Sequence, residues 1–447
     1  MLRDLSGAKD RIRHLLDHAE PPQSGDLRNV IDAFAPMVPK LQAMASQQPT
    51  PFYAFDQAGF AQALRRFSAL FDAQLAPHQA YYAVKSNHHP WLLETAAAEG
   101  YGLDVSSAEE MTAALQLPAV PIVFSGPAKS AGDHQLAIAH RERVTVHLDS
   151  FGELARLGAL LQARYTGPDG QPTCQLRCGV RVHTGVHGAW SKFGIPLDEL
   201  PEFLNQAAAF PHLAVCGLQA HLSWNRTPEP YVQVLALIGK MLREGLTGPQ
   251  RAQMAFIDIG GGYKPHGLEG FFPKDDPLAS ILHTANEAFG VTSEFLEPYY
   301  PKPSTPLAEY AQAIGGAFAR EIRSVVPAVA YTEPGRIVST YAMHIVLRVV
   351  DKKTKDLVIV DGGVNLVGWE KYLAIYAPVL NLTRPSLREF PVKIGGSLCD
   401  AEDIWGGHCY GDGIELGDVL VVPFQGAYAW GLAQQFIRPI APVRRMP

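Results

Sequence analysis

One lysine stands at the end of an apolar, β-prone run, where Lys85 follows Ala80–Val84. We expect such a lysine to be half buried. Burial disfavours the ammonium form, lowers the pKa of the side chain and leaves an amine that can attack a carbonyl. A lysine that simply extends from a strand end to water is the common alternative. The neighbouring motifs must therefore decide between the two.

A second candidate is a glycine run that follows the apolar segment Ile257–Ile259, namely Gly260, Gly261 and Gly262. Consecutive glycines let backbone N–H groups approach an anion closely, so this loop can hold a phosphate. A plain turn is the alternative interpretation.

Three further motifs place reactive groups at predicted strand ends or in loops. Glu333 and Arg336 supply a carboxylate and a guanidinium, although a turn with a surface ion pair would look the same. His221 ends another strand, where a buried structural histidine is the alternative. Cys399 and Asp400 lie together in a glycine-rich loop, where a structural cysteine is the alternative.

The elements that must position these residues alternate between strand and helix from residue 56 onward. Sustained alternation of this kind predicts parallel strands with right-handed crossovers, and the number of units suits a closed (β/α)8 barrel of the TIM type. Such barrels place their active sites at the carboxyl ends of the strands. The predicted strands are 80–84, 102–105, 122–124, 145–148, 174–182, 215–220 and 255–259.

The pattern changes after about residue 315, where short strands follow one another without long helices and predict an antiparallel β domain. We therefore expect a helical N-terminal extension over 1–48, a barrel over 49–314 and the β domain over 315–447. The barrel contains an insertion at 264–304, and strand 52–55 could join either domain. The strands expected in the β domain are 325–331, 337–350, 357–360, 390–394 and 419–422.

Composition limits the possible functions of the chain. Its 447 residues carry a net charge of −6, which gives no basic footprint for nucleic acid or an anionic membrane. No apolar window reaches the roughly 18 residues of a membrane span. The N-terminus lacks the apolar core of a signal peptide. The five cysteines are few and scattered, so we expect a cytoplasmic enzyme without a disulfide framework.

In this order, the motifs resemble the pyridoxal-phosphate-dependent decarboxylases of the alanine-racemase-like fold (fold type III). This family includes diaminopimelate, ornithine and biosynthetic arginine decarboxylases. The resemblance covers roughly residues 50–440. Asp104 follows Lys85 at the family's interval, and Lys192–Ile195 follows Arg177 in the same way.

The resemblance implies a cofactor site for pyridoxal 5'-phosphate. Lys85 would form the internal aldimine, and Glu333 would keep the pyridine nitrogen protonated so that the ring accepts the electrons left by the departing carboxylate. His221 would stack on the ring, and Asp104 would belong to the same site. The phosphate would be held by Gly260, Gly261, Gly262, Arg336 and Tyr428.

The resemblance also implies a homodimer whose sites are completed across a two-fold axis. Cys399 of the partner subunit would protonate the carbanion, and Asp400 of the partner subunit would meet the far end of an amino-acid substrate. Arg177, Asp361 and Trp369 are the other expected substrate contacts.

Two departures from the family pattern leave the substrate open. Ser223 and Trp224 stand where the family usually has Gly-Ser, so one hydroxyl contact to phosphate is shifted or missing. By our alignment, Trp369 stands where diaminopimelate decarboxylases carry a carboxylate-binding arginine. Asp361 and Asp400 would suit a cationic substrate, whereas Trp369 and the insertion would suit a larger, modified amino acid.

Two other functions compete with decarboxylation. A racemase of this fold would pair the pyridine nitrogen with arginine, and Glu333 argues against it. A non-catalytic pyridoxal-phosphate-binding protein would resemble the barrel alone, whereas this chain also carries a β domain with Cys399 and Tyr428.

Overall fold

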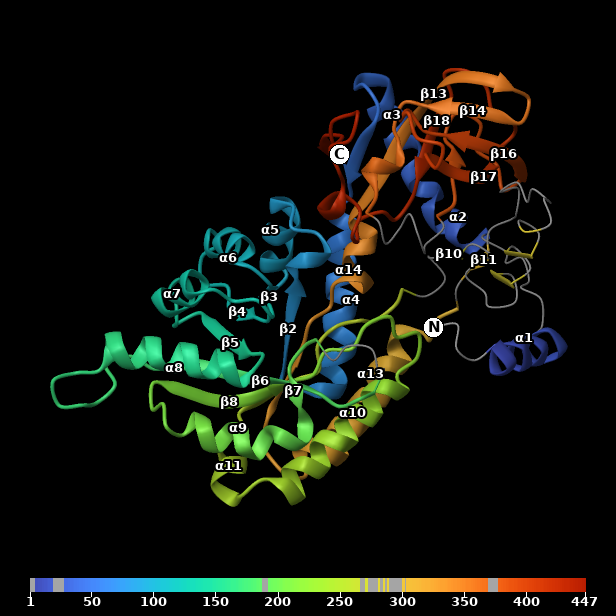
Figure 1. The fold of residues 1–447 in the computed structure, drawn as a ribbon. Coiled ribbons are helices and arrows are strands. Elements are labelled where there is room, and N and C mark those ends of the chain that lie inside the picture. Colours follow the sequence, from blue (N-terminus) through green and yellow to red (C-terminus); the bar gives the residue numbers. More distant parts are fainter. Residues whose placement is uncertain are drawn as a thin grey trace. The chain divides into compact units, whose positions relative to one another are not determined.

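The computed structural model describes residues 5–18, 28–186, 192–265, 270–271, 280–281, 284–285, 288, 300–301, 303–368 and 377–447. The chain divides into two compact units, which Figure 1 shows with their elements labelled. The barrel unit consists of Gln57–Pro265 and Ser304–Thr340. The β unit consists of Met1–Asp56, His266–Pro303 and Tyr341–Pro447.

The barrel unit contains eight parallel strands in a closed ring. The pairing of β5 with β6 closes the ring, and a short strand β7 (Ile195–Pro196) extends β6. The predicted (β/α)8 barrel is therefore confirmed. The ring strands are β2 (His78–Ala83), β3 (Gly102–Val105), β4 (Ile122–Phe124), β5 (Val144–Leu148), β6 (Leu176–His183), β8 (Leu213–Gln219), β9 (Phe256–Asp258) and β12 (Val329–Thr332).

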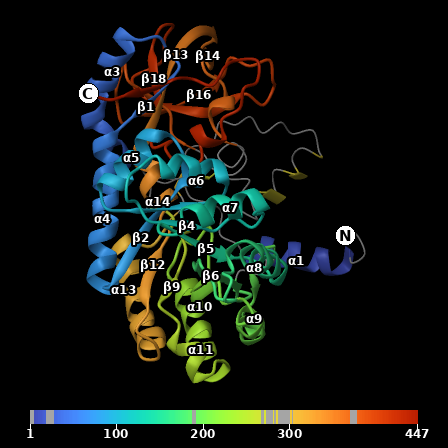
Figure 2. The same cartoon turned by 90° about the vertical axis from the view of Figure 1, so that its left-hand side faces the viewer.

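Helices lie outside these strands, as Figures 1 and 2 show for α4–α8. In the first of them, Phe60, Leu64, Phe67 and Phe71 recur every three or four residues and are all buried, so one face of the helix packs inward. The helices are α4 (Gln57–Leu75), α5 (Pro90–Ala98), α6 (Ala108–Leu115), α7 (Ala131–Ala139), α8 (Phe151–Tyr165), α9 (Leu200–Ala207), α10 (Glu229–Lys240), α11 (Gly248–Ala252), α13 (Leu307–Phe318) and α14 (Arg336–Ser339).

Three consecutive barrel helices begin at a serine. The hydroxyls of Ser107, Ser130 and Ser150 each accept a hydrogen bond from the backbone N–H three residues further on, at 3.2, 3.2 and 3.0 Å. This satisfies an N–H group that the helix itself leaves without a partner. The helices α6, α7 and α8 therefore start close behind β3, β4 and β5, and the intervening loops are short.

An aromatic plug fills the barrel beneath the strand ends. A Cβ on Gly179 would lie 2.9 Å from the Phe256 ring, and one on Gly217 would lie 2.3 Å from it, so these two glycines make room for the phenyl group. The Phe256 ring stacks on Tyr331, with centroids 4.6 Å apart and planes at 12°. This packed layer supports the polar residues at the carboxyl ends of the strands.

The β unit is built on one eight-stranded sheet in the order β14-β16-β17-β15-β18-β13-β1-β19. Since β13 pairs with both β18 and β14, six of these strands close into a ring, and β1 and β19 extend from it. The pairings β1–β19, β14–β16 and β15–β17 are parallel, so the predicted antiparallel sheet is mixed. The strands are β1 (Phe52–Phe55), β13 (Met343–Thr354), β14 (Leu357–Val360), β15 (Leu380–Asn381), β16 (Glu389–Gly395), β17 (Ile404–Tyr410), β18 (Val419–Val422) and β19 (Val443–Arg445).

The N-terminal segment is helical, as predicted, but it is not separate from the β unit. Its helices are α1 (Leu5–His18), α2 (Arg28–Phe34) and α3 (Val38–Gln47). Phe34, Leu41 and Met44 pack into one apolar cluster with Val346 and Val421 of the β unit's sheet. The extension over 1–48 therefore contributes to the core of this unit.

Two predicted domain boundaries are corrected. Strand 52–55 joins the β unit as β1, so the barrel unit begins at Gln57 instead of residue 49. The barrel unit ends at Thr340 instead of residue 314, because β12 pairs in parallel with β2 and β9. The sequence analysis predicted this strand as 325–331 but assigned it to the β domain, because only a four-residue helix, α14, follows it and the strand–helix alternation ends early.

The predicted insertion at 264–304 lies between β9 and α13, and most of it is outside the described residues. Within it, β10 (Gly270–Phe271) pairs antiparallel with β11 (Tyr300–Pro301). Among the residues that the structure describes, no helix is both long enough and apolar enough to span a membrane.

Candidate active site

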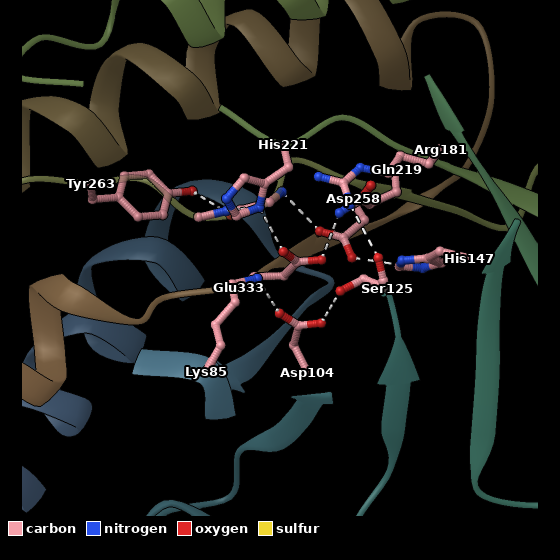
Figure 3. A network of polar contacts seen from close by, with 12 residues as sticks. Lys85, Asp104, Ser125, His147, Arg181, Gln219, His221, Asp258, Tyr263 and Glu333 are labelled. Carbon is pink, nitrogen blue, oxygen red and sulfur yellow. Dashed lines mark hydrogen bonds and ion pairs between the residues drawn. The ribbon is translucent and has the colours of Figure 1, made fainter. Parts of the chain in front are cut away.

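Reactive side chains in or directly after all eight ring strands meet at one end of the barrel, where Figure 3 shows them together. Lys85 lies in a 3-10 turn, η2 (Val84–Ser86), directly after β2. Asp104 lies near the carboxyl end of β3, His221 follows β8, and Glu333 follows β12. The carboxyl ends of parallel strands meet at the same rim, so residues 248 positions apart in the chain become neighbours.

Lys85 is held by a buried carboxylate. Its Nζ lies 2.9 Å from Oδ2 of Asp104, and the hydroxyl of Ser125 donates to the other oxygen of that carboxylate. The lysine side chain is 32% exposed, which confirms the expected half-burial. Burial and the nearby charge of Glu333 raise the pKa of Asp104 to about 6, against the opposing effect of Lys85. The amine is thus oriented while it remains accessible.

Glu333 is fully buried and accepts two hydrogen bonds. Gln219 Nε2 donates to one carboxylate oxygen at 2.9 Å, and His221 Nδ1 donates to the other at 2.8 Å. Burial alone would raise the pKa of Glu333, but the hydrogen bond from His221 and the nearby charge of Lys85 hold it well below its usual value. Burial lowers the pKa of His221 to about 4. At neutral pH this pair is an ionised carboxylate and a neutral imidazole.

A second buried acid, Asp258, belongs to the same polar network. Asp258 accepts a hydrogen bond from the backbone N–H of Gly260 at 2.8 Å, and its second oxygen lies 3.8 Å from Nε2 of His147. Burial and the charge of Glu333 raise the pKa of Asp258 well above its usual value. Burial also lowers the pKa of His147 to about 3. The pKa values of these two carboxyl groups are thus shifted in opposite directions.

The glycine loop is fixed through its carbonyl groups. The carbonyl of Gly260 accepts from the Glu333 N–H at 2.9 Å, and that of Gly262 accepts from the Asn225 N–H at 3.0 Å. The carbonyl of Gly261 accepts from the Tyr231 hydroxyl at 2.7 Å. A trans peptide points its N–H away from its C=O, so the following N–H groups point away from these partners. Backbone N–H groups in such a row suit an anion where they are not already engaged, and the Gly261 nitrogen lies 3.2 Å from Nδ1 of His221.

The loop also requires glycine for steric reasons. A Cβ on Gly261 would lie 2.3 Å from the carbonyl oxygen of Glu333, and one on Gly262 would lie 2.1 Å from that of Leu222. Gly262 also has a φ of +90°, which favours glycine. The backbone can approach its neighbours this closely only without side chains.

Arg336 begins α14 and is buried, with 9% of its surface exposed. Its guanidinium lies over the ring of Trp224, 5.1 Å from the centroid. The segment that carries Trp224 runs beside the glycine loop, because Asn225 bridges to Tyr263 in parallel. Arg336 therefore lies near the segment that runs beside the glycine loop.

Arg177 is a correction, because the structure places it at the amino end of β6. Its guanidinium donates to the Tyr331 hydroxyl at 3.2 Å and lies 5.2 Å from the centroid of the Phe256 ring. Arg181, four residues further along the same strand, reaches the site instead and donates to the Ser125 carbonyl at 3.1 Å. Both arginines share one face of the strand, so the pattern alone did not distinguish their heights in the barrel.

Cys399 and Asp400 lie on an exposed loop of the β unit. The buried Asp403 shapes this loop, since its carboxylate accepts from the N–H groups of Val364 at 2.7 Å and Leu398 at 2.6 Å. The structure thus presents both predicted side chains at the surface of the unit.

Three predicted site residues remain, namely Asp361, Tyr428 and Trp369. Asp361 accepts from the Thr50 hydroxyl and from the Arg348 N–H, so both of its oxygens are engaged inside the β unit. This gives Asp361 a structural position and corrects its assignment to substrate. Tyr428 is half buried, with a φ of +54°. Trp369 lies outside the described residues.

The sequence interpretation missed several polar residues of the site. Gln219 stands two positions before His221, so strand alternation could have placed both on one face. Asp258 is a charged residue inside an otherwise apolar strand, which was also a usable signal. Ser125, Arg181 and Asp403 carry no comparable local signal.

The comparisons with known proteins agree with this geometry. Residues 61–340 match the family model described as "Pyridoxal-dependent decarboxylase, pyridoxal binding domain". A diaminopimelate decarboxylase of Methanothermobacter thermautotrophicus is 27% identical, over 88% of this chain and 85% of that protein. The 2-[(L-alanin-3-ylcarbamoyl)methyl]-2-hydroxybutanedioate decarboxylase of Staphylococcus aureus is 25% identical, over 88% of this chain and 92% of that protein.

Solved structures show the same fold. A diaminopimelate decarboxylase of Helicobacter pylori, complexed with L-lysine, has a TM-score of 0.71 and 21% identity, over 91% of this chain and 94% of that chain. A lysine/ornithine decarboxylase of Vibrio vulnificus, complexed with putrescine, has a TM-score of 0.68 and 19% identity, over 92% of this chain and 98% of that chain.

Proposed function

Because the chain belongs to the pyridoxal-dependent decarboxylase family and is a pyridoxal-phosphate-dependent amino-acid decarboxylase, we propose that Lys85 is the residue that holds the cofactor. One observation carries this proposal. The accessible amine of Lys85, paired with Asp104 at 2.9 Å, lies in the same polar network as the ionised Glu333. A lysine attacks a carbonyl as the neutral amine, and Asp104, whose pKa is raised to about 6, is placed to take the proton that the ammonium must lose.

The chemistry of the residues fits each part of pyridoxal phosphate. Lys85 suits the aldehyde, Glu333 suits the ring nitrogen, and Gly260–Gly262 with Arg336 suit the phosphate. When bound, the cofactor supplies an electron-accepting ring that takes up the electrons left by the departing carboxylate.

The chain's own residues then have distinct tasks. Glu333, held by Gln219 and His221, would keep a proton at the ring nitrogen. Nδ1 of His221 lies 2.8 Å from the Glu333 carboxylate and 3.2 Å from the Gly261 nitrogen. When this nitrogen carries a proton it donates to Glu333, and without the proton it would accept from the Gly261 N–H. Asp104 would orient the Lys85 amine and accept the proton of its ammonium form.

We further propose a homodimer in the cytoplasm whose sites use the exposed loop of the partner subunit. Cys399 of the partner subunit would deliver the proton to the substrate carbon, and Asp400 of the partner subunit would meet the substrate's distal end. The exposure of Cys399 and Asp400 supports this proposal, since neither is committed to a protein core. The five cysteines are free thiols, which supports a reducing compartment.

Neither alternative function is favoured. The ionised Glu333 suits a strong electron sink and not the weaker one of a racemase. The decarboxylase relatives match over 88% of the chain, which includes the β unit and not the barrel alone.

The test of the proposed function is a covalent one. Borohydride reduction of the loaded protein is expected to fix pyridoxal phosphate onto Lys85, and Lys85→Ala is expected to abolish this label. Lys240→Ala is the matched control, because Lys240 is an exposed lysine of α10. Mapping of the reduced adduct by mass spectrometry to another lysine would reject the assignment.

The substrate requires a separate measurement. We propose an amino acid with a polar or charged distal group, and the exposed carboxylate of Asp400 favours a cationic one. Release of CO₂ should be measured with diaminopimelate, lysine, ornithine and the citrate-derived amide named for the Staphylococcus aureus relative. A response to the citrate-derived amide alone would contradict the preference for a cationic end.

A further inference from the structure

Three tyrosines with at most 1% of their surface exposed form a cluster at the glycine loop, namely Tyr231, Tyr263 and Tyr310. Two of them donate hydrogen bonds directly to the loop. The hydroxyl of Tyr231 donates to the carbonyl of Gly261 at 2.7 Å. The hydroxyl of Tyr263 donates to the carbonyl of Gly260 at 3.3 Å, and Figure 3 shows the Tyr263 side chain in place. This tyrosine cluster therefore holds two successive carbonyl groups of the loop.

The third tyrosine holds the segment that runs beside the loop. The hydroxyl of Tyr310 donates to the carbonyl of Asn225 at 2.8 Å, and the side-chain amide of Asn225 donates to the hydroxyl oxygen of Tyr231 at 3.0 Å. The backbone N–H of Asn225 donates in turn to the carbonyl of Gly262 at 3.0 Å. Each of the three loop carbonyls thus accepts a hydrogen bond from the cluster or from a residue bonded to it.

Ring packing fixes the directions of these hydroxyls. The rings of Tyr231 and Tyr263 are stacked, with centroids 5.0 Å apart and planes at 7°. The ring of Tyr310 meets both of them edge to face. Phe67 and Phe71 of α4 meet the Tyr263 ring in the same way, each with centroids 5.5 Å apart. Rings packed this closely have little freedom to turn, so their hydroxyls stay directed at their carbonyl partners.

The hydroxyls of the cluster also keep their protons. Burial raises the pKa of Tyr231 and of Tyr263 well above the usual value of a phenol. Burial raises the pKa of Tyr310 to about 12. All three side chains are therefore hydrogen-bond donors at neutral pH.

The loop needs this support because glycine restricts its own backbone less than any other residue. A trans peptide points its C=O and the following N–H in opposite directions. The bond from Tyr231 to the Gly261 carbonyl therefore sets the direction of the Gly262 N–H. The preceding nitrogen, that of Gly261, faces Nδ1 of His221 at 3.2 Å. Tyr231 thus orients the peptide group that follows the one at His221.

We propose that Tyr231 is a positioning residue of the cofactor site, whose hydroxyl holds the peptide between Gly261 and Gly262 in the orientation that binds the cofactor phosphate. Tyr263 and Tyr310 support it through the neighbouring carbonyls. This inference rests on the proposed function, because that function assigns the glycine loop to the phosphate. Without the Tyr231 hydroxyl, the peptide loses its fixed direction, and the affinity for the phosphate group falls.

The experiment measures cofactor affinity and not turnover. Dissociation constants for pyridoxal phosphate and for pyridoxal, which lacks the phosphate, should be determined by absorbance titration of the cofactor-free protein. Tyr231→Phe keeps the ring and removes the hydroxyl. It is expected to weaken pyridoxal phosphate about 3- to 10-fold, the effect of one hydrogen bond, and to leave pyridoxal affinity unchanged.

Tyr101→Phe is the matched control. The Tyr101 hydroxyl is also buried, donates to the Leu64 carbonyl at 2.8 Å and accepts from the Ser68 hydroxyl at 3.0 Å, but it does not touch the loop. This variant should lose a similar amount of thermal stability and keep both affinities. Tyr263→Phe should show a smaller selective loss than Tyr231→Phe, because the Gly260 carbonyl still accepts from the Glu333 N–H at 2.9 Å.

Three results would overturn the inference. They are an unchanged affinity for pyridoxal phosphate in Tyr231→Phe, an equal loss for both ligands in that variant, and an equal loss of pyridoxal phosphate affinity in Tyr101→Phe. If Tyr231→Phe does not fold, the same comparison between Tyr263→Phe and Tyr101→Phe decides. In each case, borohydride labelling of Lys85 in the wild-type protein would still support the proposed function. A wild-type protein that takes no label at Lys85 would instead reject the proposed function itself.

Discussion

At the scale of single residues, the polar network that contains Lys85 holds three acids whose pKa values are shifted differently. The pKa of Glu333 is held well below its usual value because the hydrogen bond from His221 and the charge of Lys85 outweigh its burial. The pKa of Asp258 is raised well above its usual value because burial and the charge of Glu333 outweigh its hydrogen bond from Gly260. Asp104 lies between these extremes, with a pKa of about 6. Groups that are this close and this different in pKa can be given separate tasks.

The different pKa shifts of Glu333 and Asp258 predict a large loss of turnover for one amide substitution and a small change for the other. Glu333→Gln should keep the cofactor but lower the turnover number by a factor of about 10² or more, because an amide cannot hold the ring nitrogen protonated. Asp258→Asn should change turnover only a few-fold, because asparagine resembles the neutral acid and keeps an oxygen for the Gly260 N–H. Steady-state kinetics on both variants checks the pair. Near-native turnover in Glu333→Gln would reject the proposed electron sink.

Asp104 predicts a pH dependence of stability. Its pKa is about 6 when folded and near the ordinary 3.8 when unfolded, so the folded protein binds this proton more tightly. The stabilisation from this group is therefore full below about pH 4 and is lost as the pH rises through about 6. Asp104→Asn lacks this loss, so its thermal midpoint should rise relative to wild type between about pH 4 and about pH 7.

Thermal unfolding of the cofactor-free proteins, followed by circular dichroism, measures that difference. Asp198→Asn, which removes an exposed aspartate, is the matched control over the same pH range. If the midpoint of Asp104→Asn also differs from wild type by a constant amount, the Asp104 carboxyl has the same pKa in the folded and the unfolded protein, and the prediction is wrong.

At the scale of elements, the sequence predicted where the barrel strands end. It did not predict how far along the barrel axis each side chain lies. Lys85, His221, Gly260 and Glu333 each follow an apolar run, which marks the carboxyl end of a strand. Arg177 and Arg181 lie on the same strand face, so alternation predicted their direction but not which one reaches the site. Strand tilt in a closed barrel sets that height, and tilt depends on pairings between distant strands.

The glycine loop gives a steric prediction at this scale. Gly261→Ala would place a methyl group 2.3 Å from the Glu333 carbonyl oxygen, so the loop must shift. A strain of about 1–3 kcal/mol is typical of such overpacking, and it should weaken pyridoxal phosphate about tenfold or more. Equilibrium titration of the cofactor-free protein measures the loss.

A matched glycine should tolerate the same change. Gly316 lies inside α13, and no atom lies within 4 Å of a Cβ built there. Gly316→Ala should therefore keep cofactor affinity and gain up to about 1 kcal/mol of helix stability. Equal cofactor affinity in Gly261→Ala and Gly316→Ala would contradict the role of the loop.

At the scale of the whole molecule, each of the two units is built from stretches that are separated along the chain. The β unit takes residues from both ends of the chain, because β1 pairs antiparallel with β13 and parallel with β19. A pattern read along the sequence assigns neighbours to one domain, so strand 52–55 and β12 were the ambiguous elements. Long-range pairing decides such cases, and local propensity does not contain it.

The last prediction concerns assembly of the proposed dimer. If Cys399 of the partner subunit completes each site, Lys85→Ala and Cys399→Ala should each be inactive alone but complementary after subunit exchange. In a mixed dimer, one site receives both intact residues and the other lacks both. Random mixing makes about half of the dimers mixed, so activity should approach roughly a quarter of the wild-type value.

Activity after mixing distinguishes this arrangement from one in which each subunit uses its own cysteine. In that second case, every site in every mixture lacks either Lys85 or Cys399, so no activity returns. Exchange must be shown independently, for example by mass spectrometry of isotopically labelled subunits. A control mixture of Lys85→Ala with Glu333→Gln should recover little, because both residues lie in the same barrel and each subunit then lacks one of them. The exposed position of Cys399 makes recovery the expected result.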